Sequence, residues 1–336
     1  MLSIVKGFRE TGRRQQGGFS LLETMVSIVV LSAVGSIVMY GMVQLTKTQG
    51  TIANRTEMHT SVRNATELLE QEIGQAGKIS LPNPATPVTL SAKTAIGDTT
   101  ATVNSSAGMF VGEQLVIDTG ASSETVLLSA VGGGNLTFAT TPLLYAHAQN
   151  VPVSVEGGFT TGIVPPDANS AACTSAGYIP FTNGSTCSVL KLYGDTNDDG
   201  SMLYVIYSCD NSTNPGVLWR NQVAFDSAAI DATTKLALLN NLQPNPADAN
   251  GNVAPCFSYQ TKQSGPNSYV MDVAVTLTEQ TQQIDPVTRQ FQKETKALLN
   301  VSPRNVYNVW RLDSIDQLNR VQTTPPSILN LLPTVP

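Results

Sequence analysis

An uncharged apolar segment, residues 24–43, lies near the start of this 336-residue chain, and Glu23 stands immediately before it. As a helix rising ~1.5 Å per residue, the segment measures about 30 Å, which matches the hydrocarbon thickness of a bilayer. The first 18 residues hold four cations and one acid, which predicts that the N-terminal end of the segment lies in the cytoplasm. A carboxylate at the start of a membrane helix is costly and usually has a partner. The identity of that partner decides what the segment does.

Two ordinary explanations of the segment leave Glu23 without a role. A cleaved secretory signal would use Ala33-Val34-Gly35 as its small-residue cleavage site, but signal cores are usually shorter and rarely carry an acid. A plain signal anchor would carry the glutamate by accident, in spite of the cost of a charge at that depth.

A third explanation gives the acid a function. The stretch Gly17-Gly18-Phe19-Ser20-Leu21-Leu22-Glu23 resembles the cleavage motif of type IV prepilins and type II secretion pseudopilins. The resemblance implies that prepilin peptidase cuts after Gly18 and that Phe19 becomes the mature, methylated N-terminus. Glu23 is then the family's fifth-position glutamate, which neutralises the Phe19 ammonium of a neighbouring subunit during assembly.

The helix is expected to continue well beyond the apolar segment. No proline occurs between Gln44 and Ala76, and apolar residues recur at helical spacing along this stretch: Leu45, Ile52, Met58, Val62, Ala65, Leu69, Ile73 and Ala76. Gly74, Gly77 and the prolines from Pro82 onward end it. The pattern predicts one helix over 19–76, roughly 85 Å long, after a leader at 1–18.

The remainder, 77–336, is predicted to be β-rich and extracytoplasmic. Residues 88–156 alternate short β-type runs with glycine turns, which predicts an inserted small barrel or sandwich. This block resembles a β module of bacterial surface and phage-tail-like proteins, a likeness that names no ligand. Over 157–322, runs at 188–193 and 202–209 predict a hairpin around GDTNDDG, and 269–278 is expected to pair with 289–301.

Residues 157–322 also resemble a known family. VLWRNQ, then LALLNNLQPNPADANGNVAPCFSY, then VSPRNV are similar, in that order, to the C-terminal domain of PilW-type minor pilins and their pseudopilin J relatives. With both ends matched, the chain is identified as an α+β, pilin-like protein: a long N-terminal helix, transmembrane in its first half, followed by a β-rich globular region.

All four cysteines follow the membrane segment, and an even count on the extracytoplasmic side predicts disulfides. Three pairings are possible, and we favour Cys173–Cys187 with Cys209–Cys256. The first of these would close a polar loop with little core of its own, where a crosslink is worth ~3 kcal/mol on the chain-entropy estimate.

GDTNDDG raises the question of a calcium site. Asp195, Asn197 and Asp199 match the first half of a calcium loop, but the twelfth position is Ile206, where a bidentate Glu belongs. The alternative is a polar β-turn, for which Asn, Asp and Gly are the usual residues. His147 is interpreted as a loop or packing histidine, because no second metal-type residue lies near it in the sequence.

The sequence thus predicts a minor pilin rather than an enzyme. It has no catalytic or nucleotide-binding motif, and a formal charge of −6 argues against general nucleic-acid binding. The expected partners are prepilin peptidase and other pilins, and no cofactor is expected beyond the possible calcium. The subunit would be stored in the inner membrane, cleaved, and assembled into a type IV pilus near its tip. A type II secretion pseudopilin is the alternative within the class, and a membrane-anchored enzyme or binding protein with a pilin-type signal is the alternative outside it.

Overall fold

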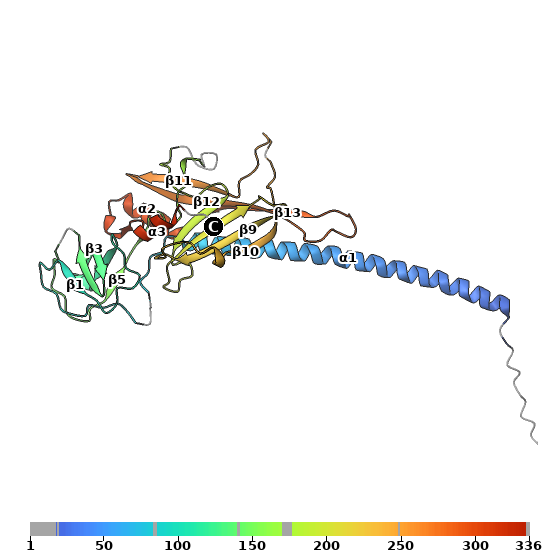
Figure 1. The fold of residues 1–336 in the computed structure, drawn as a ribbon, viewed down its shortest axis with the longest axis horizontal. Helices are drawn as coiled ribbons and strands as arrows, with labels where there is room; N and C mark the ends of the chain where they lie inside the picture. Colours follow the sequence, from blue (N-terminus) through green and yellow to red (C-terminus); the bar gives the residue numbers. More distant parts are fainter. Residues whose placement is uncertain are drawn as a thin grey trace, which may run out of the picture.

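The computed structural model describes residues 18, 20–82, 86–139, 142–169, 177–247 and 249–333. One long helix, α1 (Leu21–Gln75), extends from a β-rich globular part that gathers around its C-terminal half (Figure 1). The predicted α+β class, with a long N-terminal helix before antiparallel sheets, is confirmed. The predicted leader falls on residues of which only Gly18 is described.

The larger sheet is antiparallel and has seven strands in the order β11-β12-β10-β9-β8-β7, with β13 pairing β12 outside this path. Its strands are β7 (Val189–Gly194), β8 (Leu203–Asp210), β9 (Gly216–Ala224), β10 (Leu236–Gln243), β11 (Phe257–Ser264), β12 (Asn267–Gln280) and β13 (Lys293–Val301). Both predicted pairings are present: β7 with β8 on either side of GDTNDDG, and β12 with β13.

A second, five-stranded antiparallel sheet has the order β1-β4-β3-β2-β5. Its strands are β1 (Thr100–Thr102), β2 (Gln114–Ile117), β3 (Glu124–Gly132), β4 (Asn135–Phe138) and β5 (Val153–Val155). Bridges from Thr89 to Pro152 and from Leu90 to Val103 link one segment to both edges of this sheet, next to β5 and β1. The sheet encloses an apolar core of its own, built around Leu90, Leu115, Ile117 and Leu136.

Short elements complete the fold around the large sheet. These are β6 (Gly158–Phe159), β14 (Val321–Gln322), α2 (Arg304–Asp313) and α3 (Pro326–Leu331). The two-residue strands β6 and β14 pair in parallel. Val306 and Val309 of α2 pack on Tyr269 and Met271 of β12. The β14 segment also holds the small sheet, because Gln322 exchanges hydrogen bonds with Gln114 at 2.9 and 3.0 Å.

The C-terminal half of α1 lies on one face of the large sheet. Ala65, Leu69 and Ile73 are buried in one apolar cluster with residues of the large sheet from β7 to β12, among them Leu190 and Val205. The predicted apolar stripe is therefore the docking face from Met58 onward. Leu45 and Ile52, which the same periodicity includes, are 59% exposed, because the sheet does not extend that far along the helix.

A buried charge locks this docking, and helical periodicity gave no sign of it. Glu72 is 1% exposed and accepts a hydrogen bond from the Tyr207 hydroxyl at 2.5 Å. Arg220 donates Nε to the same carboxylate at 3.2 Å and forms an ion pair through Nη2. Burial, assisted by Glu72, raises the pKa of Tyr207 far above its usual range, so its hydroxyl remains a donor. The three groups satisfy one another at the interface between helix and sheet.

Removal of this carboxylate should loosen the helix. We expect Glu72→Ala to lower the free energy of unfolding of the full chain in detergent by ~3 kcal/mol, because Arg220 and Tyr207 lose their buried partner. Denaturant titration measures this change in the free energy of unfolding. Arg63→Ala, which removes an exposed ion pair to Glu67 on the same helix, is the control and should change little. Equal effects of the two substitutions would contradict the assigned role of Glu72.

Candidate functional site

The first turn of α1 is the part of the structure in which the sequence places function. Ser20 caps the helix in an extended conformation, and its hydroxyl accepts a hydrogen bond from the Leu22 amide at 3.3 Å. Glu23 lies in that first turn, where the helix dipole favours a negative charge. Gly18, on the leader side of the predicted cleavage bond, is exposed, and Phe19 lies outside the described residues.

Polar side chains near the start of α1 are satisfied by the helix itself, with one exception. Thr24 donates to the carbonyl of Leu21 at 2.8 Å, and Ser27 donates to the carbonyl of Glu23 at 2.7 Å. Such bonds let hydroxyls lie in an apolar environment without an external partner. The Glu23 carboxylate has no hydrogen bond or ion pair within the described part of the chain.

The apolar side chains of this half are uncovered on every side of the helix. All described residues from Ser20 to Thr46 are exposed, including Leu21 (78%), Leu31 (73%) and Ile37 (73%). Among the described helices, α1 is the one long and apolar enough to cross a membrane. Its N-terminal half is therefore a surface for lipid or for other apolar helices, while its C-terminal half is anchored in the fold.

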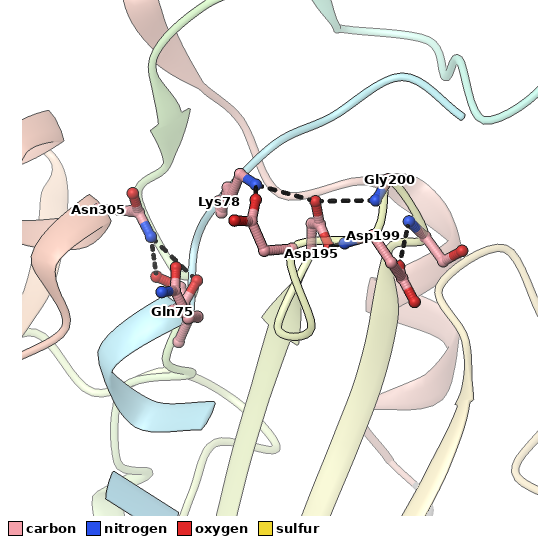
Figure 2. A network of polar contacts seen from close by, with 9 residues as sticks. Gln75, Lys78, Asp195, Asp199, Gly200 and Asn305 are labelled. Atoms are coloured by element: carbon pink, nitrogen blue, oxygen red, sulfur yellow. Dashed lines mark hydrogen bonds and ion pairs between the residues drawn. The ribbon is translucent and has the colours of Figure 1, made fainter. Parts of the chain in front are cut away.

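The other end of α1 is fixed by a polar network that includes the candidate metal loop (Figure 2). Asn305, from α2, donates to the Gln75 carbonyl at 3.0 Å and caps the helix. Gly77 follows with φ +82°, and an added Cβ would lie 2.9 Å from Val306 Cγ2. Only glycine turns the chain away from the helix in so little space.

Lys78, directly after this turn, reaches the GDTNDDG stretch between β7 and β8. Its ammonium contacts Asp195 Oδ2 at 3.1 Å and forms an ion pair with Asp198. Asp195 is 1% exposed and also accepts hydrogen bonds from the amides of Asp199 and Gly200, at 3.0 and 3.2 Å. Burial alone would raise the pKa of Asp195, but the hydrogen bonds from Lys78 and the two amides outweigh it and lower the pKa.

The structure therefore gives the three candidate calcium ligands different surroundings. Asp195 is buried and paired with Lys78, whereas Asn197 and Asp199 are exposed, with Asp199 accepting a bond from the Ser201 amide at 2.8 Å. Within the described ranges, no three His, Cys, Asp or Glu side chains form a group that could hold a metal ion. Calcium binding at this loop stays a prediction, and any calcium ion would compete with the ammonium of Lys78.

The cysteines are engaged in disulfides wherever they are described. Cys209 at the end of β8 bonds Cys256, which directly precedes β11, and this is one of the two pairings favoured from the sequence. Cys187 is disulfide-bonded as well. Its expected partner, Cys173, lies outside the described residues. The Cys209–Cys256 bond ties the long connection between β10 and β11 to β8, which lies next to the edge strand β7 of the large sheet.

His147 is a packing residue, as interpreted, but it is not isolated. Its ring is buried between two carboxylates, with Nδ1 3.1 Å from Asp118 and Nε2 2.8 Å from Glu124. Glu124 also accepts bonds from the amides of Leu144 and Tyr145, at 2.8 and 3.0 Å. The two acids lie 29 and 23 positions away in the sequence, so the neighbourhood of His147 along the chain gave no sign of them. The cluster fastens the loop after β4 to the small sheet.

Comparison with protein families matches residues 13–39 to the prokaryotic N-terminal methylation motif. Neither a curated protein nor a solved structure matches the chain. The match covers the cleavage junction, Glu23 and much of the uncovered half of α1. It supports a precursor similar to type IV pilins and pseudopilins, and it is consistent with processing by prepilin peptidase and anchorage in a membrane.

The ion pair at the β7–β8 turn predicts how this loop responds to calcium. Because Lys78 already neutralises Asp195, we expect the full chain to melt at the same temperature in millimolar calcium and in chelator. Lys78→Met should destabilise it by about 2 kcal/mol, since a buried carboxylate loses its charged donor. Lys93→Met, at an exposed lysine that forms no hydrogen bond or ion pair with the described residues, is the matched control. A rise of several degrees in calcium that Asp195→Ala abolishes would establish the metal site instead.

Proposed function

We propose that this chain is a minor pilin, an assembly subunit of a type IV pilus that acts near the tip and catalyses no reaction. The observation that carries the proposal is Glu23, which has no partner among the described residues and stands at the fifth position after the Gly18–Phe19 junction on an otherwise apolar, uncovered stretch of helix. A carboxylate in such surroundings requires a cation from outside the subunit. The new α-ammonium of a neighbouring Phe19 supplies one at the same depth.

The proposed sequence of events follows from the two halves of α1. Before assembly, the apolar half crosses the inner membrane with its N-terminus in the cytoplasm, as the cations before it favour. Prepilin peptidase removes residues 1–18, and the Phe19 amine is methylated. The helix then leaves lipid for a bundle of like helices, where its apolar side chains pack and the charge of Glu23 is neutralised.

A minor role is favoured over that of the major subunit by the shape of the globular part. The five-stranded sheet with its own core adds bulk beyond the end of α1 (Figure 1). A repeating shaft requires every subunit to pack against many copies, whereas a rare subunit near the tip has free space around it. A pseudopilin of a secretion system shares the same helix chemistry and is the alternative within the class.

The first test is the mature N-terminus. Mass spectrometry of protein recovered from membranes of cells that contain prepilin peptidase should find Phe19 as the first residue, carrying a methyl group. In cells lacking the peptidase, the same method should find the leader intact. A start at Ser36 would identify an ordinary cleaved signal instead, and an uncleaved chain in peptidase-containing cells would overturn the proposal.

The second test concerns Glu23 itself. Glu23→Gln keeps the size of the side chain but removes its charge, so the subunit should still enter the membrane. We expect its recovery in sheared filaments to fall by at least about tenfold, because loss of a buried ion-pair partner costs ~3 kcal/mol or more. Glu67→Gln, at an exposed carboxylate on the docked half of the same helix, is the matched control. Equal recovery of the two variants would argue against the assembly role.

A further inference from the structure

The loop between β12 and β13 exposes an unusual share of apolar surface. Ile284, Val287 and Phe291 are 53%, 59% and 44% exposed, and all three lie in the short connection 281–292. Single exposed apolar residues are ordinary on a protein surface, but a group on one projecting loop marks an interaction site.

The turn at the tip holds these side chains outward. The Asp285 side chain accepts hydrogen bonds from the amides of Val287 and Thr288, both at 2.7 Å. The Asp285 amide donates a hydrogen bond to the Gln290 carbonyl at 3.0 Å, and the Arg289 amide donates one to the Asp285 carbonyl at 2.8 Å. The polar groups of the turn thus bond to one another. These bonds define the conformation of the turn, and this conformation leaves the apolar side chains at the surface.

The loop lies against α1 at the point where the globular part first meets the helix. A Cβ on Gly50 would lie 3.2 Å from Pro286 Cγ, so proline and glycine are in close contact. Asn54 donates to the Gln283 carbonyl at 3.4 Å, and Arg55 donates to Gln292 at 2.5 Å. Figure 1 shows this loop extending alongside α1 toward the uncovered half of the helix.

This position is close to the expected bilayer surface. Gly50 follows the last residue of the apolar segment, Val43, by two helical turns, a rise of roughly 10 Å. The headgroup region on each side of a bilayer is about 5–8 Å thick. The tip itself meets α1 at Gly50, through Pro286, whereas the base of the loop meets Asn54 and Arg55. Apolar side chains of the tip therefore need to extend only a few ångströms toward Val43 to enter the headgroups when the helix spans the membrane.

The charges around the tip suit an anionic surface. Arg289 is an exposed residue of the turn, Arg55 donates to Gln292 at the base of the loop, and Lys47 lies about one helical turn before Gly50 on α1. The acid within the tip, Asp285, is buried and bonded to the amides of the turn. The other acids near the base of the hairpin, Glu57, Glu279 and Glu294, lie farther from the apolar segment. Cations beside apolar side chains are typical of segments that bind acidic phospholipid surfaces.

We propose that the tip of the β12–β13 hairpin, residues 284–291, is a membrane-contact surface that rests in the headgroup layer of an anionic phospholipid bilayer before assembly. The proposal depends on the membrane insertion of α1 in the proposed function. Contact by the tip fixes the rotation and depth of the helix, since α1 alone offers lipid the same apolar surface on every side.

The test uses the full chain reconstituted in vesicles of phosphatidylethanolamine and phosphatidylglycerol. A cysteine introduced by Val287→Cys is labelled with an environment-sensitive fluorophore, and nitroxide lipids are added as quenchers. Ile96→Cys, at a 70% exposed aliphatic residue in the small-sheet part of the chain, is the matched control. The label at 287 should shift to the blue and be quenched at least about twofold more than the label at 96, and vesicles without phosphatidylglycerol should reduce the difference.

Resistance to carbonate extraction, measured on the same vesicles, separates the two proposals. If the chain resists extraction but the two labels behave alike, the lipid contact is refuted while the assembly proposal stands. Protection of the label at 287 only in assembled filaments would likewise refute it and assign the tip to a neighbouring subunit. If carbonate releases the chain, membrane insertion fails, and both proposals fail with it.

Discussion

The docking of half a helix onto a sheet is the interaction on which the rest of this structure depends. A helix of 55 residues cannot be covered along its whole length by a globular part of this size. The helix therefore has two halves with different sequence patterns, one covered and one exposed. The C-terminal half has a one-sided apolar stripe, which is buried against the large sheet. Glu72, paired with Arg220 and Tyr207, adds a polar contact that permits only one rotation of the helix on the sheet. The N-terminal half, apolar on all sides, receives a fixed direction from that anchor.

The contacts at the end of α1 show how the small sheet is attached without changing the docking of the helix on the large sheet. Asn305 caps the helix, Gly77 turns the chain, and Lys78 ties the exit to the β7–β8 hairpin. These contacts fix the chain before it enters the small sheet, and β14 secures that sheet again through Gln322 and Gln114. The small sheet encloses its own core, so its folding does not compete for the apolar surface that holds the helix.

The sequence was a good guide wherever short-range pattern determined the result. The helix, its apolar stripe from Met58, its end near Gly77 and two hairpins all follow from periodicity and turn residues. Contacts between distant residues were not predictable in this way. Glu72 meets Arg220 across 148 residues, Lys78 meets Asp195 across 117, and His147 lies between two acids of another hairpin. Local sequence pattern does not predict which residues of two distant segments lie opposite each other. GDTNDDG is an example. It matches the first half of a calcium loop, but the same residues are typical of a turn, and in the structure Asp195 pairs with the distant Lys78.

Two glutamates on the same helix, Glu23 and Glu72, have opposite surroundings in this structure. Glu72 is buried with an arginine and a tyrosine of its own subunit, so its charge contributes to the stability of the monomer. Glu23 has no partner in the described chain and stands on a surface that nothing covers. A subunit that satisfied Glu23 internally would gain stability but would lose the charge that selects a neighbour. In the proposed function, the Glu23 carboxylate is what favours assembly, because a bundle of like helices would supply the cation that lipid does not.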